Sequence, residues 1–179
     1  KGVIKHVLLY LAGDMQSHVP NAKELSGNGS KFNSWMRNKT LIAVDEVKTD
    51  EKRDLIEILK PLLSEGKIEF QGKGADQSKG DNYANWIFFS NHKDAIPIDD
   101  SSRRFAIFYS AIQSKADLDR LGMDDQYFRQ FYSWLGVDSA GNVTHGRGLQ
   151  AVAGWLMRRN IARGSIPMRG PVTTSEAEA

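Results

Sequence analysis

The order of apolar and polar residues predicts two helices in the first part of the chain. Within residues 1–13, apolar residues recur at the spacing of one helical face, and Gly13 can end that helix. The members of this face are Val3, Ile4, Val7, Leu8 and Leu11. A second apolar face within residues 55–63 predicts a helix that Thr49 or Asp50 opens and Gly66 closes.

Continuous apolar runs predict buried strands at residues 41–45, 86–91 and 103–109. Residues 67–83 combine an alternating segment, a glycine-rich tip and a return segment, a pattern typical of a β-hairpin with an exposed turn. Residues 14–30 contain Pro and several Gly residues, which predict an irregular connection.

Helices that alternate with strands apolar on both faces indicate an α/β fold whose sheet is at least partly parallel. Beyond Ser110 the apolar spacing is again helical. The resulting division is a core over residues 1–112, a helical C-terminal portion of the same domain over residues 113–170, and a polar tail over residues 171–179.

The composition narrows the class of protein. The 179 residues, 40% of them apolar, allow one well-covered core. There is no run of about eighteen apolar residues and no signal-like N-terminus, so we expect a cytoplasmic protein that neither enters a membrane nor is secreted. The absence of cysteine excludes disulfides and thiolate metal sites, and the four scattered histidines show no ligand spacing. A net charge of +2 is too small to indicate nucleic-acid binding by itself.

Two acids, Asp45 and Glu46, end the first buried strand. Ligands bind outside the carboxyl ends of strands in open α/β sheets. At such an end one carboxylate can hold Mg²⁺ while its neighbour orients or deprotonates water, which is what nucleotide hydrolysis requires. Asn91 ends the next strand and can hydrogen-bond a γ-phosphate or the attacking water. The alternative is that the acids only lead the chain out of the core and that Asn91 is a turn residue.

Two further features bear on this nucleotide hypothesis. Arg103 and Arg104 begin the third strand and can reach developing phosphate charge, although a solvated strand start has the same pattern. A complete G-x-x-x-x-G-K-[ST] phosphate loop is missing from the sequence. Lys1 and Gly2 stand directly before the first helix, where such a loop would end, so we expect the chain to be a fragment cut at this loop.

Taken in order, these segments resemble the superfamily 3 helicase domain of phage, plasmid and large-virus primase-helicases, an AAA+-like ATPase. The resemblance covers about residues 1–110. After the first helix it runs through KFNSWMRNKTLIAVDE into a Walker B strand, DLIEILKPLLSEGKIEFQGKGAD as helix and hairpin, WIFFSN as sensor-1 strand, and IPIDDSSRRFAIF as arginine-finger segment. It implies an AAA+-like P-loop NTPase core with a mostly parallel sheet, a β-hairpin insertion and a helical C-terminal part.

The resemblance also implies a role for each catalytic candidate. Asp45 would serve Mg²⁺, and Glu46 would be the catalytic carboxylate that polarises water. Asn91 would be the sensor. Arg104 would be the finger that acts across a subunit interface, with Arg103 as the alternative.

For nucleotide binding, the resemblance makes Lys1 the last piece of the Walker A loop, with Gly2 where the family has Ser or Thr. The implied cofactors are ATP and Mg²⁺. Glycine has no hydroxyl for the metal, and the upstream glycines of the loop are missing from the sequence, so this incomplete Walker A loop puts ATP binding and activity of the isolated chain in doubt.

The hairpin resembles the loop with which the family contacts single-stranded DNA. Lys73 stands between two glycines at its tip and would contact the strand backbone, with Lys79 assisting. One lysine gives little affinity, but a homo-oligomer, by the resemblance a hexameric ring, would bring several phosphate contacts together. The alternative is an ordinary exposed hairpin with solubilising lysines.

The implied function is ATP-dependent translocation on single-stranded DNA and duplex unwinding during replication, as a DNA-dependent ATPase. The resemblance leaves open whether a primase domain lies upstream in the same polypeptide, and the compartment would be the cytoplasm of a bacterial host if a phage or plasmid encodes the chain. Two alternatives are an AAA+-like remodelling or packaging ATPase, and a non-catalytic DNA-binding or oligomerisation module.

The C-terminal part leaves two questions open. The arginine-rich segment 147–163 faces DNA, a neighbouring subunit or simply solvent. The aromatic residues of segment 127–134 either belong to the core, as their helical spacing favours, or stack on bases.

Overall fold

The computed structural model describes residues 2–25, 31–45, 52–74, 76–92, 105–138, 141–144 and 146–162. These residues form two compact units. The first holds the described residues from Leu11 to His92, and the second holds Gly2–Tyr10 together with the described residues from Phe105 onward.

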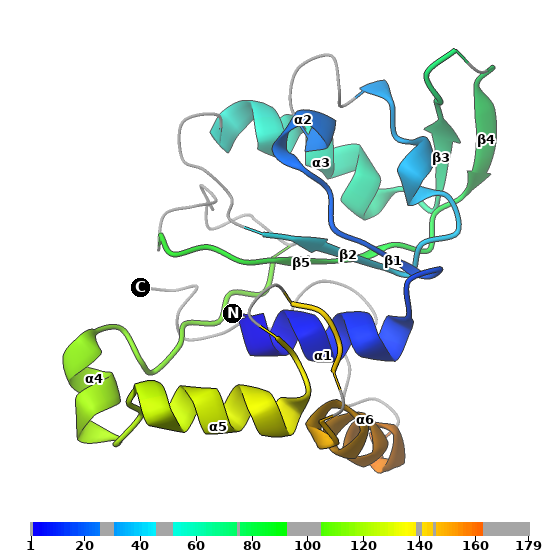
Figure 1. The fold of residues 1–179 in the computed structure, drawn as a ribbon. Helices are drawn as coiled ribbons and strands as arrows, with labels where there is room; N and C mark the ends of the chain where they lie inside the picture. Colours follow the sequence, from blue (N-terminus) through cyan, green and yellow to red (C-terminus); the bar gives the residue numbers. More distant parts are fainter. Residues whose placement is uncertain are drawn as a thin grey trace. The chain divides into compact units, whose positions relative to one another are not determined.

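The first unit is built on a three-stranded parallel sheet in the order β1-β2-β5 (Figure 1). β1 (Ser17–His18) pairs with β2 (Leu41–Val44), and β2 pairs along its whole length with β5 (Asn85–Phe88). Three successive residues of β2, from Ile42 to Val44, are buried, which requires cover on both faces of the strand. The prediction of an α/β fold with a parallel sheet is therefore confirmed.

One face of this sheet carries the main apolar core of the first unit. Helix α3 (Lys52–Ser64) lies over the sheet (Figure 1), and α2 (Ala22–Leu25) and the 3₁₀ helix η2 (Ser34–Met36) also contribute to the core. The buried members of the cluster are Leu25, Met36, Ile42, Val44, Ile68 and Phe70. Because Ile68 and Phe70 belong to the predicted hairpin, the core holds the hairpin strands against the sheet.

The hairpin is present as predicted. β3 (Lys67–Phe70) pairs antiparallel with β4 (Ser78–Asp81), and residues 71–77 form the connection. Alternation along β3 places Ile68 and Phe70 in the core and leaves the side chains of Lys67 and Glu69 exposed. One face of the hairpin is thus structural, and the other is open to solvent.

The prediction of an irregular connection over residues 14–30 is wrong in part, because β1 and α2 lie there. β1 has only two residues and exists through its pairing with β2, a partner distant in sequence that no local pattern reveals. The single turn of α2 depends on a cap: the Asn21 side chain accepts hydrogen bonds from the amides of Lys23 and Glu24.

The predicted strand over residues 103–109 is also wrong in its described part. Residues 105–109 form no strand, and the side chain of Phe108 is 75% exposed. Apolar and aromatic residues form a strand only where they can pair with another strand, so the apolar run at residues 103–109 was by itself a weak indicator.

The second unit is helical. It contains Gly2–Tyr10 of α1 (Gly2–Ala12), together with α4 (Lys115–Arg120), α5 (Asp125–Leu135) and α6 (Gly148–Arg158). Its core consists of the buried residues Val7, Leu135, Val137 and Leu149. The predicted helix at the N-terminus is confirmed, but its predicted face is only partly right, because Ile4 is 56% exposed. In the described ranges, no helix has both the length and the apolar character needed to cross a bilayer.

Candidate nucleotide site and nucleic-acid interface

The carboxyl ends of β2 and β5 lie side by side. Val44 and Phe88 are the last paired residues, and the amide of Phe89 still donates to the carbonyl of Val44 over 2.9 Å. Because the two strands are parallel and adjacent, the residues that follow them emerge at one edge of the sheet, where ligands bind in open α/β sheets. Asp45 and Asn91 are among these residues.

Asp45 is half-buried directly after β2, and its Oδ1 atom is shielded from solvent. Oxygen donors of this kind suit Mg²⁺, which is usually held by one or two carboxylates together with substrate phosphates and water. The described residues contain no group of three or more His, Asp or Glu that would form a metal cage, so any Mg²⁺ here would depend on such additional oxygens.

Asn91 is exposed on a bend three residues beyond the end of β5. The hydroxyl of Ser90 accepts a hydrogen bond from the amide of His92 over 3.0 Å, which fixes the turn around Asn91. The side chain of Asn91 is therefore available to a ligand at this edge.

The remaining nucleotide-site predictions concern residues outside the described part of the first unit. Lys1, Glu46, Arg103 and Arg104 lie outside the described residues. Gly2 begins α1 in the second unit, where a Cβ atom on it would lie 3.4 Å from the Tyr132 hydroxyl. The roles of these five residues stay predictions.

The second candidate site is the hairpin. Its exposed face pairs Lys67 with Asp81 at the base, with 2.9 Å between Nζ and Oδ1, and sets Glu69 opposite Lys79 nearer the tip. The hydrogen bond and the charge of Lys67 lower the pKa of Asp81 below its ordinary value, and Asp81 in turn raises the pKa of Lys67. This ion pair occupies Lys67, whereas Lys73 and Lys79 form no ion pair with a described carboxylate.

The Phe70 ring lies between Arg37 and Gly80, and these contacts fix the inner face of the hairpin. The guanidinium of Arg37 lies 4.6 Å from the ring centroid of Phe70, and it also donates to the hydroxyl of Ser78. A Cβ atom on Gly80 would lie 3.0 Å from the Phe70 ring. Because Gly80 has no side chain, the Phe70 ring can pack directly on the backbone of β4. The hairpin is thus held in place at its inner face.

The side chain of Asn33 fixes the C-terminal end of β3. Its Nδ2 atom donates to the backbone carbonyl of Glu69, and its Oδ1 atom accepts from the backbone amide of Gln71, each over 2.8 Å. The amide of Ser34 also donates to the carbonyl of Gln71 over 3.2 Å. Sequence reasoning missed both Asn33 and Arg37, because their partners lie more than thirty residues away in the chain.

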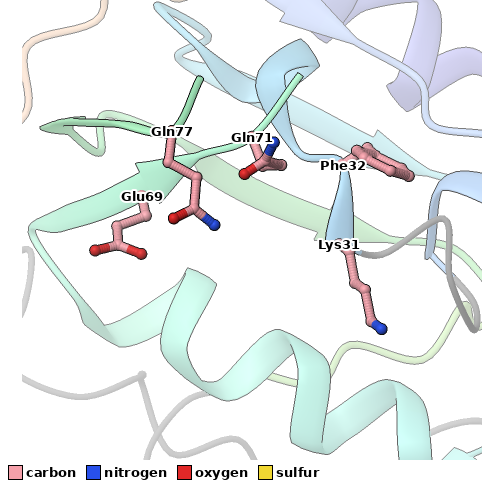
Figure 2. Close-up of a pocket in the computed structure, with 5 residues that line it drawn as sticks. All are labelled: Lys31, Phe32, Glu69, Gln71 and Gln77. Atoms are coloured by element: carbon pink, nitrogen blue, oxygen red, sulfur yellow. The ribbon is translucent and has the colours of Figure 1, made fainter. Parts of the chain in front are cut away.

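The tip projects beyond these anchors. Lys73 is exposed, and Gly74 next to it has a φ of +73°, a conformation that glycine adopts without strain. A pocket of about 430 Å³ lies where the tip joins the hairpin strands, and Figure 2 shows the side chains around it. It is lined by Lys31, Phe32, Glu69, Gln71 and Gln77.

The charge of the hairpin is balanced. Residues 67–81 contain three lysines and three acids. Net attraction for an anionic strand is therefore small, and any contact with such a strand would depend on the position of Lys73 at the tip.

Three comparisons place the chain among known proteins. The model of one protein family, described as a family of unknown function (DUF5906), matches residues 1–104. No curated protein matches with statistical significance. A solved structure, the apo form of the C-terminal region (305–718) of NrS-1, is similar with a TM-score of 0.52 and 19% identity over 87% of this chain and 39% of that one.

Two A-form apo structures of the same NrS-1 region give TM-scores of 0.45 and 0.48, with 22% and 23% identity. Each match covers 59% of this chain and 24% of that one. The chain therefore spans well under half the length of the solved chains that it matches. The likeness at a TM-score of 0.52 concerns the fold alone.

Proposed function

The chain belongs to the DUF5906 family, and from the geometry of its sheet and hairpin we propose that it is part of a DNA-dependent ATPase that moves along single-stranded DNA during replication. The observation that carries the proposal is the parallel pairing of β2 with β5, which brings Asp45 and Asn91 out at one edge of the sheet. A carboxylate and an amide at neighbouring strand ends are what a hydrolysed phosphate and its metal require.

In this proposal the residues at the sheet edge divide the work. Asp45 holds Mg²⁺, whose charge offsets that of the ATP phosphates when both are bound. Glu46 follows directly in the chain and accepts a proton from the attacking water. Asn91 orients the water or the γ-phosphate, and Arg104, or Arg103, offsets developing charge from a neighbouring subunit in a hexameric ring.

The hairpin supplies the DNA contact. Its anchors at Asn33 and Arg37 hold the strands, while Lys73 at the tip presents an ammonium group to a phosphate of the strand. A ring would repeat this contact in each subunit, which compensates for the balanced charge of a single hairpin.

The test is Glu46→Gln in the complete polypeptide that contains this chain. Hydrolysis of ATP should fall by roughly 10²- to 10⁴-fold while ATP binding persists, because the amide keeps the shape of the side chain but cannot accept the proton. Glu57→Gln on the exposed face of α3 is the matched control and should leave hydrolysis unchanged. Hydrolysis that persists in Glu46→Gln removes Glu46 from this role.

The same assay separates the alternatives. Stimulation of hydrolysis by single-stranded DNA supports the helicase proposal, whereas stimulation only by duplex DNA or by protein supports a remodelling or packaging ATPase. A complete polypeptide that binds DNA without hydrolysing ATP would be a binding or oligomerisation module.

A further inference from the structure

The second unit carries an exposed surface of aromatic and basic side chains along α6, here called the α6 surface and made up of Trp134, Arg147, Trp155, Arg158 and Arg159. Trp155 is 56% exposed and Trp134 is 49% exposed. Exposed apolar side chains indicate a contact surface when they lie together, and indole rings carry a large apolar area.

Packing explains why these rings stay outside the core. Leu149 and Ala153, on the opposite side of α6, are buried and face the core of the unit. Trp134 lies against the start of the helix, where a Cβ atom on Gly148 would fall 2.7 Å from its ring. Trp155 follows Gly148 by two helical turns, so the two rings lie along one side of α6, separated by about 10 Å of helix length.

The arginines lie beside these rings. The guanidinium of Arg159 sits 5.1 Å from the ring centroid of Trp155, within range of a cation–π contact. The guanidinium of Arg158 lies back over Gly154, 3.5 Å from where a Cβ atom would stand. None of Arg147, Arg158 and Arg159 forms an ion pair with a carboxylate of the described residues.

The charge of this part of the chain is one-sided. Residues 139–175 contain five arginines and neither Asp nor Glu. The hairpin segment 67–81, in contrast, balances its three lysines with three acids. The segment that carries α6 therefore attracts an anionic partner more strongly than the hairpin segment does.

We infer that the α6 surface binds single-stranded nucleic acid, with unpaired bases stacking on Trp155 and Trp134 and the arginines contacting the phosphates. Half-exposed indole rings beside arginines that form no ion pair with a described carboxylate match this ligand, because an aromatic ring can stack on a base that has no partner strand and the phosphates need cations. The contact extends the proposed function by a second site but rests on different residues, and it requires no ATP hydrolysis.

The experiment measures binding of a fluorescein-labelled oligothymidine, about 20 nucleotides long, to the full chain by anisotropy over a salt series. Trp155→Ala should weaken binding by roughly 5- to 150-fold, and Trp155→Phe should retain most of the affinity because the ring still stacks. The double variant Arg158→Ala/Arg159→Ala should reduce the slope of log K against log[salt] by about 1.4, from two lost phosphate contacts.

A matched control removes two arginines from the same unit but away from α6. Arg120→Ala/Arg129→Ala has the same net charge as the α6 double variant and should leave the salt slope nearly unchanged. Equal slopes for the two double variants overturn the inference. The inference is also wrong if the α6 double variant changes the sedimentation of the protein but not its binding of the oligonucleotide. That result would mean that the α6 surface is a contact between subunits.

Lys73→Ala separates this inference from the hairpin proposal. If Lys73→Ala loses binding of the oligonucleotide and the α6 variants do not, the inference about the α6 surface is wrong and the hairpin is the binding site. If only the α6 variants lose binding, the α6 surface is the binding site and the hairpin is not.

Discussion

Val44 and Phe88 lie directly opposite each other as the last paired residues of two parallel strands. The hydrogen bond from Phe89 to the carbonyl of Val44 extends the pairing by one step, so the chain leaves both strands at the same level. Any two adjacent parallel strands end on the same side of a sheet, whatever their sequence. Asp45 and Asn91, which are 46 positions apart in the chain, therefore both follow strand ends at one edge of the sheet.

The first prediction concerns the carboxylate at this edge. Asp45→Asn in the complete polypeptide should reduce Mg²⁺-dependent ATP hydrolysis by about 100-fold or more, because a neutral amide binds the metal less well than a carboxylate. Asp76→Asn at the exposed hairpin tip removes the same charge far from the strand ends in sequence and should have no such effect. Wild-type hydrolysis by Asp45→Asn would exclude Asp45 as the metal ligand.

The second prediction concerns the hairpin lysines. Lys73→Ala should weaken binding of single-stranded DNA and lower its salt slope by about 0.7, the value for one phosphate contact. Lys79→Ala should have a smaller effect, because Lys79 stands opposite Glu69 and already lies in a partly neutralised environment. Lys23→Ala, exposed on α2, serves as the control. An unchanged salt-titrated affinity of Lys73→Ala would remove the tip from the DNA interface.

The third prediction tests the ring. Subunits with Arg104→Ala, mixed with subunits with Glu46→Gln, should recover part of the ATPase activity that each variant lacks alone, because some interfaces then combine an intact arginine with an intact carboxylate. Activity is measured against the mixing ratio. A mixture no more active than the sum of its separate parts places the arginine and the carboxylate in one subunit.

Local patterns were sufficient for much of this architecture. The run that became β2 is buried on both faces, the run that became β5 is half-buried apart from the exposed Asn85, and the hairpin carries its own alternation and turn glycines, so each is visible within a short window of sequence. The edge that holds Asp45 and Asn91 followed from these strands once they were assumed to be parallel.

Non-local contacts account for the misses. β1 depends on pairing with Leu41 and Ile42, and the hairpin depends on Asn33 and Arg37, whose polar side chains look in the sequence like ordinary surface residues. Phe105 to Tyr109 show the opposite error, since strand-forming residues there do not form a strand. A sequence window reports what a segment prefers and not which partner the fold provides.

The fourth prediction follows from the ion pair at the hairpin base. The pKa of Asp81 is lower in the folded protein than its ordinary 3.8, so its contribution to stability is present above that pH and is lost as the pH falls through the folded value. The pKa of Lys67 is raised above 10.5, so its contribution is present below that pH and is lost as the pH rises through the folded value.

Asp81→Asn should therefore lower the melting temperature slightly at neutral pH, with the difference from wild type closing at pH values well below 3.8. Both side chains are exposed, so the effect is expected to be small. In the Lys67→Ala background the same substitution should have a smaller effect, because only the hydrogen bond that the Tyr83 hydroxyl donates to Asp81 remains to be lost. A difference that persists in strong acid would mean that the introduced amide perturbs the hairpin for reasons unrelated to charge.

The last prediction concerns the crossing that positions α6. A Cβ atom on Gly146 would lie 2.3 Å from the backbone N and Cα atoms of Gly136, the residue that ends α5 with a φ of +81°. Backbone atoms cannot yield as a flexible side chain can, so Gly146→Ala must separate the end of α5 from the start of α6. The free energy of unfolding should fall by about 1–3 kcal/mol or more.

Gly66→Ala is the matched control for this substitution. Gly66 joins α3 to β3, has no atom within 4 Å of its Cβ position and lies outside the positive-φ region, so an added methyl meets nothing. Denaturant unfolding, followed by tryptophan fluorescence, compares the two variants. Because Trp134 packs against Gly148 at the same crossing, Gly146→Ala should also change the fluorescence of the folded protein. If Gly146→Ala is as stable as Gly66→Ala, the contact between the two glycines does not hold α6 in place, and the α6 surface would have to be positioned by the apolar core around Leu149 alone.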